Sequence, residues 1–253
     1  DYKTVIQSSL QKKELESVGI NIMTLEDAVR FILQRRDDLT TVDRLLCNII
    51  KISNKSSPTS ILKRLSIFNQ YRADFIVKNK TIISETIDSL NSQGLERLKE
   101  SWIISTLIDR GGLNELLKFS LSEDQWVIVD EGFYQLLTTL FSSYKKKVEM
   151  EHVSKCLPFL PPVNFLINIQ SSLDNCFKRC KSRGFSKRRR FQRRTDSEVK
   201  TFITNSSKIL DFSNDYAEES SIPLLSIENN GDIGILQGKQ SKLYFEILAL
   251  AGI

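Results

Sequence analysis

Residues 126–135 read Trp-Val-Ile-Val-Asp-Glu-Gly-Phe-Tyr-Gln, and this stretch decides the fold class. Its first four residues form an apolar run too short for a helix, which indicates a buried β-strand. Asp130, Glu131 and Gly132 follow as a turn, and a helical pattern then runs from 133 to 141. A buried strand that leads directly into a helix is typical of an α/β protein with a parallel sheet.

Two more apolar strands are expected further along the chain, at 164–169 and 223–227. Helical patterns at 172–183 and 196–216 separate them, and a last helix is expected at 239–250. Apolar strands that alternate with helices predict one parallel sheet with helices on both faces. We therefore expect the strands at 126–130, 164–169 and 223–227 to lie in the same sheet.

The N-terminal half has a different pattern. A β-branched run at 3–7 predicts a strand, whereas 24–120 is mainly helical in periodicity. Helices are expected at 24–36, 41–52, 61–71 and 86–108, the last ending at Gly111 and Gly112. We accordingly divide the chain into an N-terminal strand and helix of the α/β core (1–23), a large helical insertion (24–120) and the remaining α/β core (121–253).

Composition narrows the class of protein. The 253 residues include only 10 glycines and 5 prolines, which argues against collagen-like, low-complexity and turn-dense all-β architectures. No apolar run reaches the roughly 18 residues that span a bilayer, so we expect no membrane segment and a cytoplasmic location. The four cysteines, Cys47, Cys156, Cys176 and Cys180, form no CxxC pair and are interpreted as reduced thiols.

The chain has a single histidine, His152. One histidine argues against a Ser-His-Asp or Cys-His catalytic triad and against most zinc sites. Because His152 follows Glu149 and Glu151 in a polar stretch, we interpret it as a surface histidine on a helix.

The segment 178–194 contains ten Lys and Arg residues and no acid, while the rest of the chain holds 26 Lys and Arg against 31 Asp and Glu. Three interpretations follow: a phosphate-binding lid, a nucleic-acid arm or nuclear import signal, and a solvated helix face. A solvated face normally interleaves acids, which disfavours the third. Seven of the ten are arginines, whose planar guanidinium groups suit phosphate.

Asp130 and Glu131 follow the strand at 126–130, at the sheet edge where open α/β sheets bind ligands. One carboxylate there can hold hydrated magnesium, and a second can orient an attacking hydroxyl. The alternative is purely structural, because acids at this position also cap the helix that follows.

These motifs occur in the order of a known family. Residues 126–135, then 157–169, then Cys176-Phe177-Lys178-Arg179 to Arg183-Gly184, resemble the second half of P-loop kinases of the thymidylate kinase-like group. The resemblance covers about 126–230. It implies a P-loop NTPase-like fold and ATP-dependent phosphoryl transfer to a small-molecule or nucleotide acceptor, with Mg²⁺.

The resemblance also implies residue roles. Asp130 would be the Walker B carboxylate near magnesium, and Glu131 would lie by the acceptor. Arg179, Arg183 and the arginines that follow, Arg188 among them, would form a lid over the phosphates. Asn229 and Asn230 would form the turn near the adenine.

One departure concerns the phosphate-binding loop. The family's Gly-x-x-x-x-Gly-Lys-Ser/Thr motif is absent, and the nearest match, from Gly234 to Gln240, is one residue short and falls after the last strand. We expect a copy truncated before this loop, with its first strand missing. A pseudokinase that never had the loop is the alternative.

These hypotheses carry structural expectations. In the family's strand order the P-loop strand lies between the strand at 126–130 and the one at 164–169, so this central position should be empty. The basic segment 178–194 should be a mobile lid, because like charges repel without an anion. The different-class alternative is a non-catalytic protein that binds nucleic acid or another polyanion through 178–194.

Overall fold

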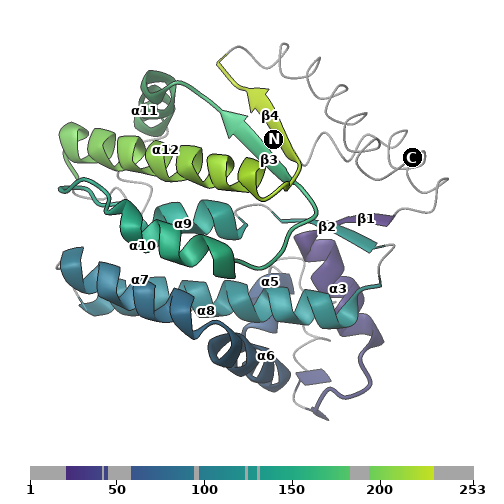
Figure 1. Cartoon of the computed structure of the whole chain (residues 1–253). Helices are drawn as coiled ribbons and strands as arrows, with labels where there is room; N and C mark the ends of the chain where they lie inside the picture. The colour runs from purple at the N-terminus through teal and green to yellow at the C-terminus, as the bar shows by residue number, and fades with distance from the viewer. Residues whose placement is uncertain are drawn as a thin grey trace. The chain divides into compact units, whose positions relative to one another are not determined.

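The computed structural model describes residues 21–41, 43–44, 58–93, 97–122, 125–129, 132–182 and 194–230. Most of these residues are helical, and the strands among them form two separate parallel pairs (Figure 1). The chain divides into two compact units, the first of 1–83 with 98–132 and the second of 84–97 with 133–253. Each unit contains one of the two described strand pairs.

The first unit holds strands β1 (Asn21–Thr24) and β2 (Gln125–Ile128), which pair in parallel with Asn21 opposite Gln125. The strand predicted at 126–130 is therefore confirmed, although it ends at Ile128. Strand β1 was not predicted, because four residues carry too little periodicity and its partner lies a hundred residues away in sequence. The strand expected at 3–7 lies outside the described residues.

The second unit holds strands β3 (Leu166–Gln170) and β4 (Leu224–Glu228), also parallel, with Leu166 opposite Leu224. Both confirm predicted strands. Among the described residues β2 pairs with β1 and β3 pairs with β4, so the expectation of one sheet through all three predicted strands stays a prediction. Within the described chain, β2 and β3 each have a main-chain partner on one edge only, so nothing there links the two pairs.

Four helices pack together in the first unit: α3 (Leu25–Arg35), α5 (Pro58–Leu62), α6 (Ser66–Lys78) and α8 (Arg97–Ser120). Apolar side chains from all four form one core: Val29, Ile32, Leu33, Leu39, Ile61, Leu62, Leu65, Phe68, Tyr71, Leu113 and Leu116. Helix α7 (Lys80–Gln93) begins in this unit and continues into the second. The helix predicted at 24–36 is confirmed, and that at 41–52 lies almost entirely outside the described residues.

Three boundaries differ from the prediction. The helix expected at 86–108 covers the end of α7 and the start of α8, because α7 ends at Gln93 and α8 begins at Arg97. The expected helix at 61–71 is two helices, because Leu65 is extended and the carboxylate of Asp43 accepts hydrogen bonds from the backbone N–H and the hydroxyl of Ser66 at 3.1 and 2.6 Å. These bonds start α6 afresh at Ser66. Helix α8 does not end at Gly111 and Gly112, since contacts with α6 outweigh the weak helix propensity of two glycines.

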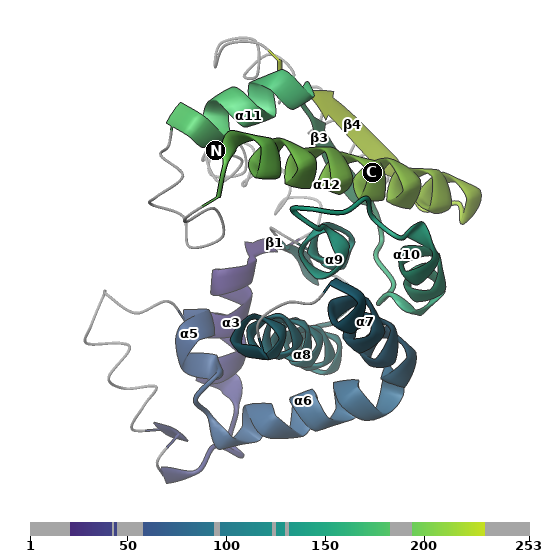
Figure 2. The same ribbon diagram turned by 90° about the vertical axis from the view of Figure 1, so that its left-hand side faces the viewer.

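The second unit is built around α12 (Asp196–Glu219), which lies between the β3–β4 pair and helices α9 (Phe133–Phe141) and α10 (Met150–Cys156) in both views (Figures 1 and 2). A 3₁₀ turn, η1 (Leu157–Phe159), follows α10, and α11 (Leu173–Ser182) follows β3. These helices confirm the patterns at 133–141, 172–183 and 196–216. The helix expected at 239–250 lies outside the described residues, and the division at 23 and 120 remains a prediction.

Candidate functional site

The predicted site residues divide into two groups. Asp130, Glu131, Arg183 and Arg188 lie outside the described residues, so their roles and the magnesium site at Asp130 remain predictions. The described residues on either side of the acidic pair are Val129, which is 39% exposed, and Gly132, one residue before α9 begins. The strand before the acidic pair and the helix after it are therefore as expected.

Arg179, Asn229 and Asn230 lie together in the second unit, at the carboxyl ends of β3 and β4. The backbone N–H of Asn229 donates to the carbonyl of Gln170 at 2.7 Å, which extends the parallel pairing beyond β4. Arg179 lies on the helix that follows β3, and its Nη2 donates to Oδ1 of Asn229 at 3.2 Å. The structure thus brings together the three predicted residues that it describes.

Two serines that the sequence analysis did not identify complete this group. The hydroxyl of Ser171 donates to the Asn229 carbonyl at 3.1 Å, and Nη1 of Arg179 lies 3.5 Å from that hydroxyl. The backbone N–H of Ser172 donates to Oδ1 of Asn230 at 2.7 Å. We call Ser171, Ser172, Arg179, Asn229 and Asn230 the strand-end cluster. Their position directly after a predicted strand was the available signal for the serines.

The first turn of α11 has a sequence-determined start. Ser172 is its N-cap, since its hydroxyl accepts a hydrogen bond from the N–H of Asn175 at 3.3 Å. The positive end of the helix dipole therefore lies at the strand-end cluster. Asn230 is held from a second side, because its Nδ2 donates to Oε1 of Glu228 at 2.8 Å.

Arg179 contacts neutral oxygens in the described part of the chain, those of Ser171 and Asn229. Its charge is therefore not cancelled by a neighbouring carboxylate there. This guanidinium group has neutral partners and lies next to a helix N-terminus, at the carboxyl end of parallel strands. Such an arrangement favours an anionic ligand or a polar aromatic one.

Two other cations of the basic segment 178–194, unlike Arg179, form ion pairs with carboxylates. Lys181 pairs with Asp196 at 2.7 Å, and Arg194 pairs with Glu198 at 3.1 Å while lying over the Tyr144 ring. Both acids belong to the first turn of α12, where Thr195 and Glu198 form a capping box. These two cations are thus already neutralised, and 183–193, where a mobile lid was expected, lie outside the described residues.

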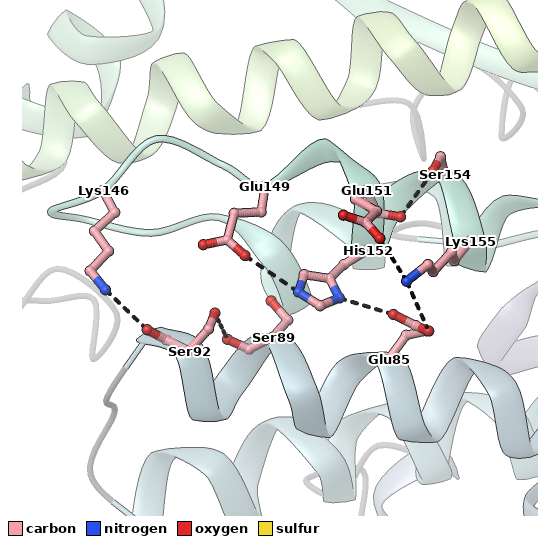
Figure 3. Close-up of polar contacts among 9 residues, drawn as sticks. All are labelled: Glu85, Ser89, Ser92, Lys146, Glu149, Glu151, His152, Ser154 and Lys155. Atoms are coloured by element: carbon pink, nitrogen blue, oxygen red, sulfur yellow. Dashed lines mark hydrogen bonds and ion pairs between the residues drawn. The ribbon is translucent and has the colours of Figure 1, made fainter.

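A second polar group surrounds His152, which lies on helix α10 as expected but is half-buried and not at the surface. The imidazole is 17% exposed, and its Nδ1 lies 2.9 Å from Oε2 of Glu85 on α7 (Figure 3). Its Nε2 lies 3.4 Å from Oε2 of Glu149, and the ring stacks on Phe141 with 3° between the planes. The sequence shows the flanking acids but not the carboxylate that α7 contributes.

The thiols offer no second site. Cys156, Cys176 and Cys180 are free, and Cys47 is not described. Burial, together with the nearby Glu85 carboxylate, raises the pKa of Cys156 to about 12, which leaves it unreactive as a nucleophile at neutral pH. No three His, Cys, Asp or Glu side chains in the described residues are grouped to hold a metal ion.

No protein-family model matches the chain, and neither the curated proteins nor the solved structures hold a significant match to it. Among the described helices, none is both long and apolar enough to cross a bilayer.

Proposed function

We propose that this chain binds an adenine nucleotide at the strand-end cluster. The observation that carries the proposal is the hydrogen bond from Arg179 to Asn229, which joins two residues 50 positions apart in sequence. The resemblance to thymidylate kinase-like P-loop kinases had independently assigned both residues to nucleotide binding. Their side chains offer guanidinium and carboxamide groups to a base or a phosphate.

The strand pairing supports the finer proposal of a P-loop kinase-like fold. Both described pairs are parallel, and long connections that contain helices, not hairpins, join the two strands of each pair. Doubly wound α/β proteins have connections of this kind.

On this proposal the whole protein transfers a phosphoryl group from ATP to a small-molecule or nucleotide acceptor. Asp130 and Glu131 would hold magnesium and orient the acceptor, and Arg179 and Arg183 would meet charge on the transferring group. Arg188 would contact the phosphates, and Asn229 and Asn230 would contact the base. A pseudokinase with the same nucleotide site but no turnover is a variant of this proposal.

The test is equilibrium binding of a fluorescent ATP analogue to the chain, with competition by unlabelled ATP, GTP and adenosine. Replacing Arg179→Met should weaken binding at least tenfold, because a guanidinium hydrogen bond to a ligand contributes about 1.5–3 kcal/mol. Lys181→Met is the matched control, since this cation lies on the same helix but pairs with Asp196. Its affinity should stay within about twofold of the unmodified chain.

Two results would count against the proposal. Equal binding by the Arg179→Met and Lys181→Met variants would show that the strand-end cluster does not contact the nucleotide. Binding of single-stranded DNA or RNA that falls steeply with salt, without any mononucleotide binding, would instead favour the polyanion-binding alternative through 178–194.

A further inference from the structure

The imidazole of His152 has a carboxylate on each of its two nitrogens, as Figure 3 shows. Glu85 of α7 lies at Nδ1, and Glu149, the residue before α10, lies at Nε2. A protonated imidazole has two N–H donors, whereas the neutral ring has one donor and one acceptor. Both contacts can therefore be ion pairs only when the ring carries a proton.

We propose that His152 is a proton-operated clasp that fastens α7 to α10 within the second unit. With the ring protonated, one cation bridges two carboxylates, by a charge-assisted hydrogen bond to Glu85 and an ion pair with Glu149. When the ring loses its proton, one nitrogen lone pair faces a carboxylate oxygen, and the ionic attraction to both acids disappears. The clasp is closed in acid and loosened in base.

Charged side chains on three neighbouring elements belong to this cluster or lie on the same elements. Helix α7 contributes Glu85 and Asp88, and α10 contributes Glu151 and Lys155. The segment 142–149 contributes Glu149 at the ring and carries Lys145, Lys146 and Lys147 along its length. Helix α9 and turn η1 contribute no charged side chain, and α9 presents the apolar ring of Phe141 instead.

Ordinary carboxylates and lysines keep their charge between about pH 5.5 and 8.5, while an imidazole changes charge in this range. The thiol of Cys156, next along α10, does not titrate there either, since burial and Glu85 raise its pKa to about 12. Glu85 is 15% exposed, which limits screening of its contact by water.

The same two parts of the chain are also joined by a contact that does not depend on pH. Lys146 donates from Nζ to the backbone carbonyl of Ser92 at 3.1 Å, linking the segment 142–149 to the end of α7. A lysine stays charged over this range. Lys146→Met therefore provides a matched control that weakens the α7 contact equally in acid and in base.

The experiment measures urea unfolding of the whole chain at pH 5.5, 7.0 and 8.5 for the unmodified protein, His152→Gln and Lys146→Met. His152→Gln should lower the folding equilibrium constant at both pH values. The factor by which it does so should be about tenfold larger at pH 5.5 than at pH 8.5, as expected for a charge-assisted contact. The loss in Lys146→Met should be the same at all three values. An equal loss for His152→Gln at pH 5.5 and 8.5, or a larger one at pH 8.5, would overturn the proposal.

A second variant covers the case in which His152→Gln does not fold. Glu149 is 60% exposed, so Glu149→Gln should leave the fold intact. This substitution removes one of the two carboxylate charges at the ring. It should therefore reduce the pH dependence of amide hydrogen exchange in residues 84–92. The exchange rates are corrected for the intrinsic pH dependence of exchange and compared with those of α12. Exchange in 84–92 that is pH-independent after correction in the unmodified chain, or unchanged in its pH dependence by Glu149→Gln, would also refute the clasp.

Discussion

The ring of Phe75 packs directly against the backbone of Gly111, at the point where helices α6 and α8 cross in the first unit. A Cβ atom built on Gly111 would overlap the Phe75 ring, and Phe75 itself is fully buried. Gly111 therefore allows α6 to pack closely against α8, and the side chain that requires a glycine there, Phe75, belongs to α6.

This contact predicts that Gly111→Ala destabilises the protein. The higher helix propensity of alanine should raise the free energy of unfolding by about 1 kcal/mol. Overpacking against a buried ring should lower it by about 1–3 kcal/mol, so the net change is destabilising. Gly112→Ala should cost less, because the nearest atoms to its Cβ, Cγ and the backbone N of Arg72, lie at 3.0 and 3.1 Å, farther than the Phe75 ring lies from a Cβ on Gly111. Urea unfolding measures both, and Phe75→Leu should recover part of the Gly111→Ala loss. Greater stability of Gly111→Ala than of the unmodified chain would contradict the observed crossing.

Asp43 predicts a pH-dependent contribution to stability. Burial alone would raise its pKa, but hydrogen bonds from Ser66 and Thr40 outweigh burial and hold the pKa below the usual value. A lowered pKa means that the stabilisation is present above the unfolded-state value of about 3.9 and is lost as pH falls through the folded-state pKa. Asp43→Asn should thus cost about 1–3 kcal/mol at pH 7 and progressively less in acid.

Asp38→Asn is the control for Asp43, because Asp38 is 54% exposed and pairs with Arg36 at the surface. Its cost at pH 7 should stay within about 1 kcal/mol. Chemical unfolding of the two variants between pH 3 and pH 7 checks both expectations. A cost for Asp43→Asn that does not change with pH would show that the carboxylate charge is not what starts α6.

Cysteine reactivity tests the burial of α10. Cys156 is fully buried, and a pKa of about 12 leaves roughly one thiol in 10⁴ ionised at pH 8. Cys176 and Cys180 are half-buried on α11. We expect iodoacetamide to modify Cys176 and Cys180 at least tenfold faster than Cys156 in the folded chain, by peptide mass spectrometry. The difference should vanish in urea, and early modification of Cys156 would contradict the packing of α10.

The elements that the sequence predicts correctly are those whose own pattern determines them. Strand β2 contains a continuous apolar run, and helix α9 has a helical apolar pattern. Strands β3 and β4 are also mainly apolar, and because they pair in parallel, the residues that follow them, Arg179 and Asn229, lie close together. Strand β1 was missed because its partner, and not its own sequence, makes it a strand. The continuation of α8 through Gly111 depends on Phe75 in the same way.

The environment of His152 was missed for a related reason. Its neighbours Glu149 and Glu151 are visible in the sequence, but Glu85 lies 67 positions away on a different helix. A contact of this kind arises from tertiary packing, for which a single sequence carries no periodic signal. The strand-end cluster was partly predictable because parallel strands bring their carboxyl ends to one edge of a sheet.

The end of α12 gives a last prediction, which links stability to the proposed site. Ser221 has φ of 57°, in the left-handed region, and its N–H donates to the Glu218 carbonyl at 3.0 Å while that of Ile222 donates to Ala217 at 2.8 Å. This arrangement ends the helix and directs the chain into β4 three residues later. Glycine adopts such a φ without a steric cost, so Ser221→Gly should raise the unfolding free energy by about 0.5–1 kcal/mol.

Proline at the same position should have the opposite effect. Ser221→Pro fixes φ near −65° and removes the N–H, so the chain can no longer turn from α12 into β4 in the same way. Asn229 would lose its register with Gln170, and with it the contact to Arg179. We expect Ser221→Gly to raise the melting temperature and keep binding of the fluorescent ATP analogue, and Ser221→Pro to lower both. Unchanged nucleotide affinity in a folded Ser221→Pro variant would show that the position of Asn229 does not matter to the ligand.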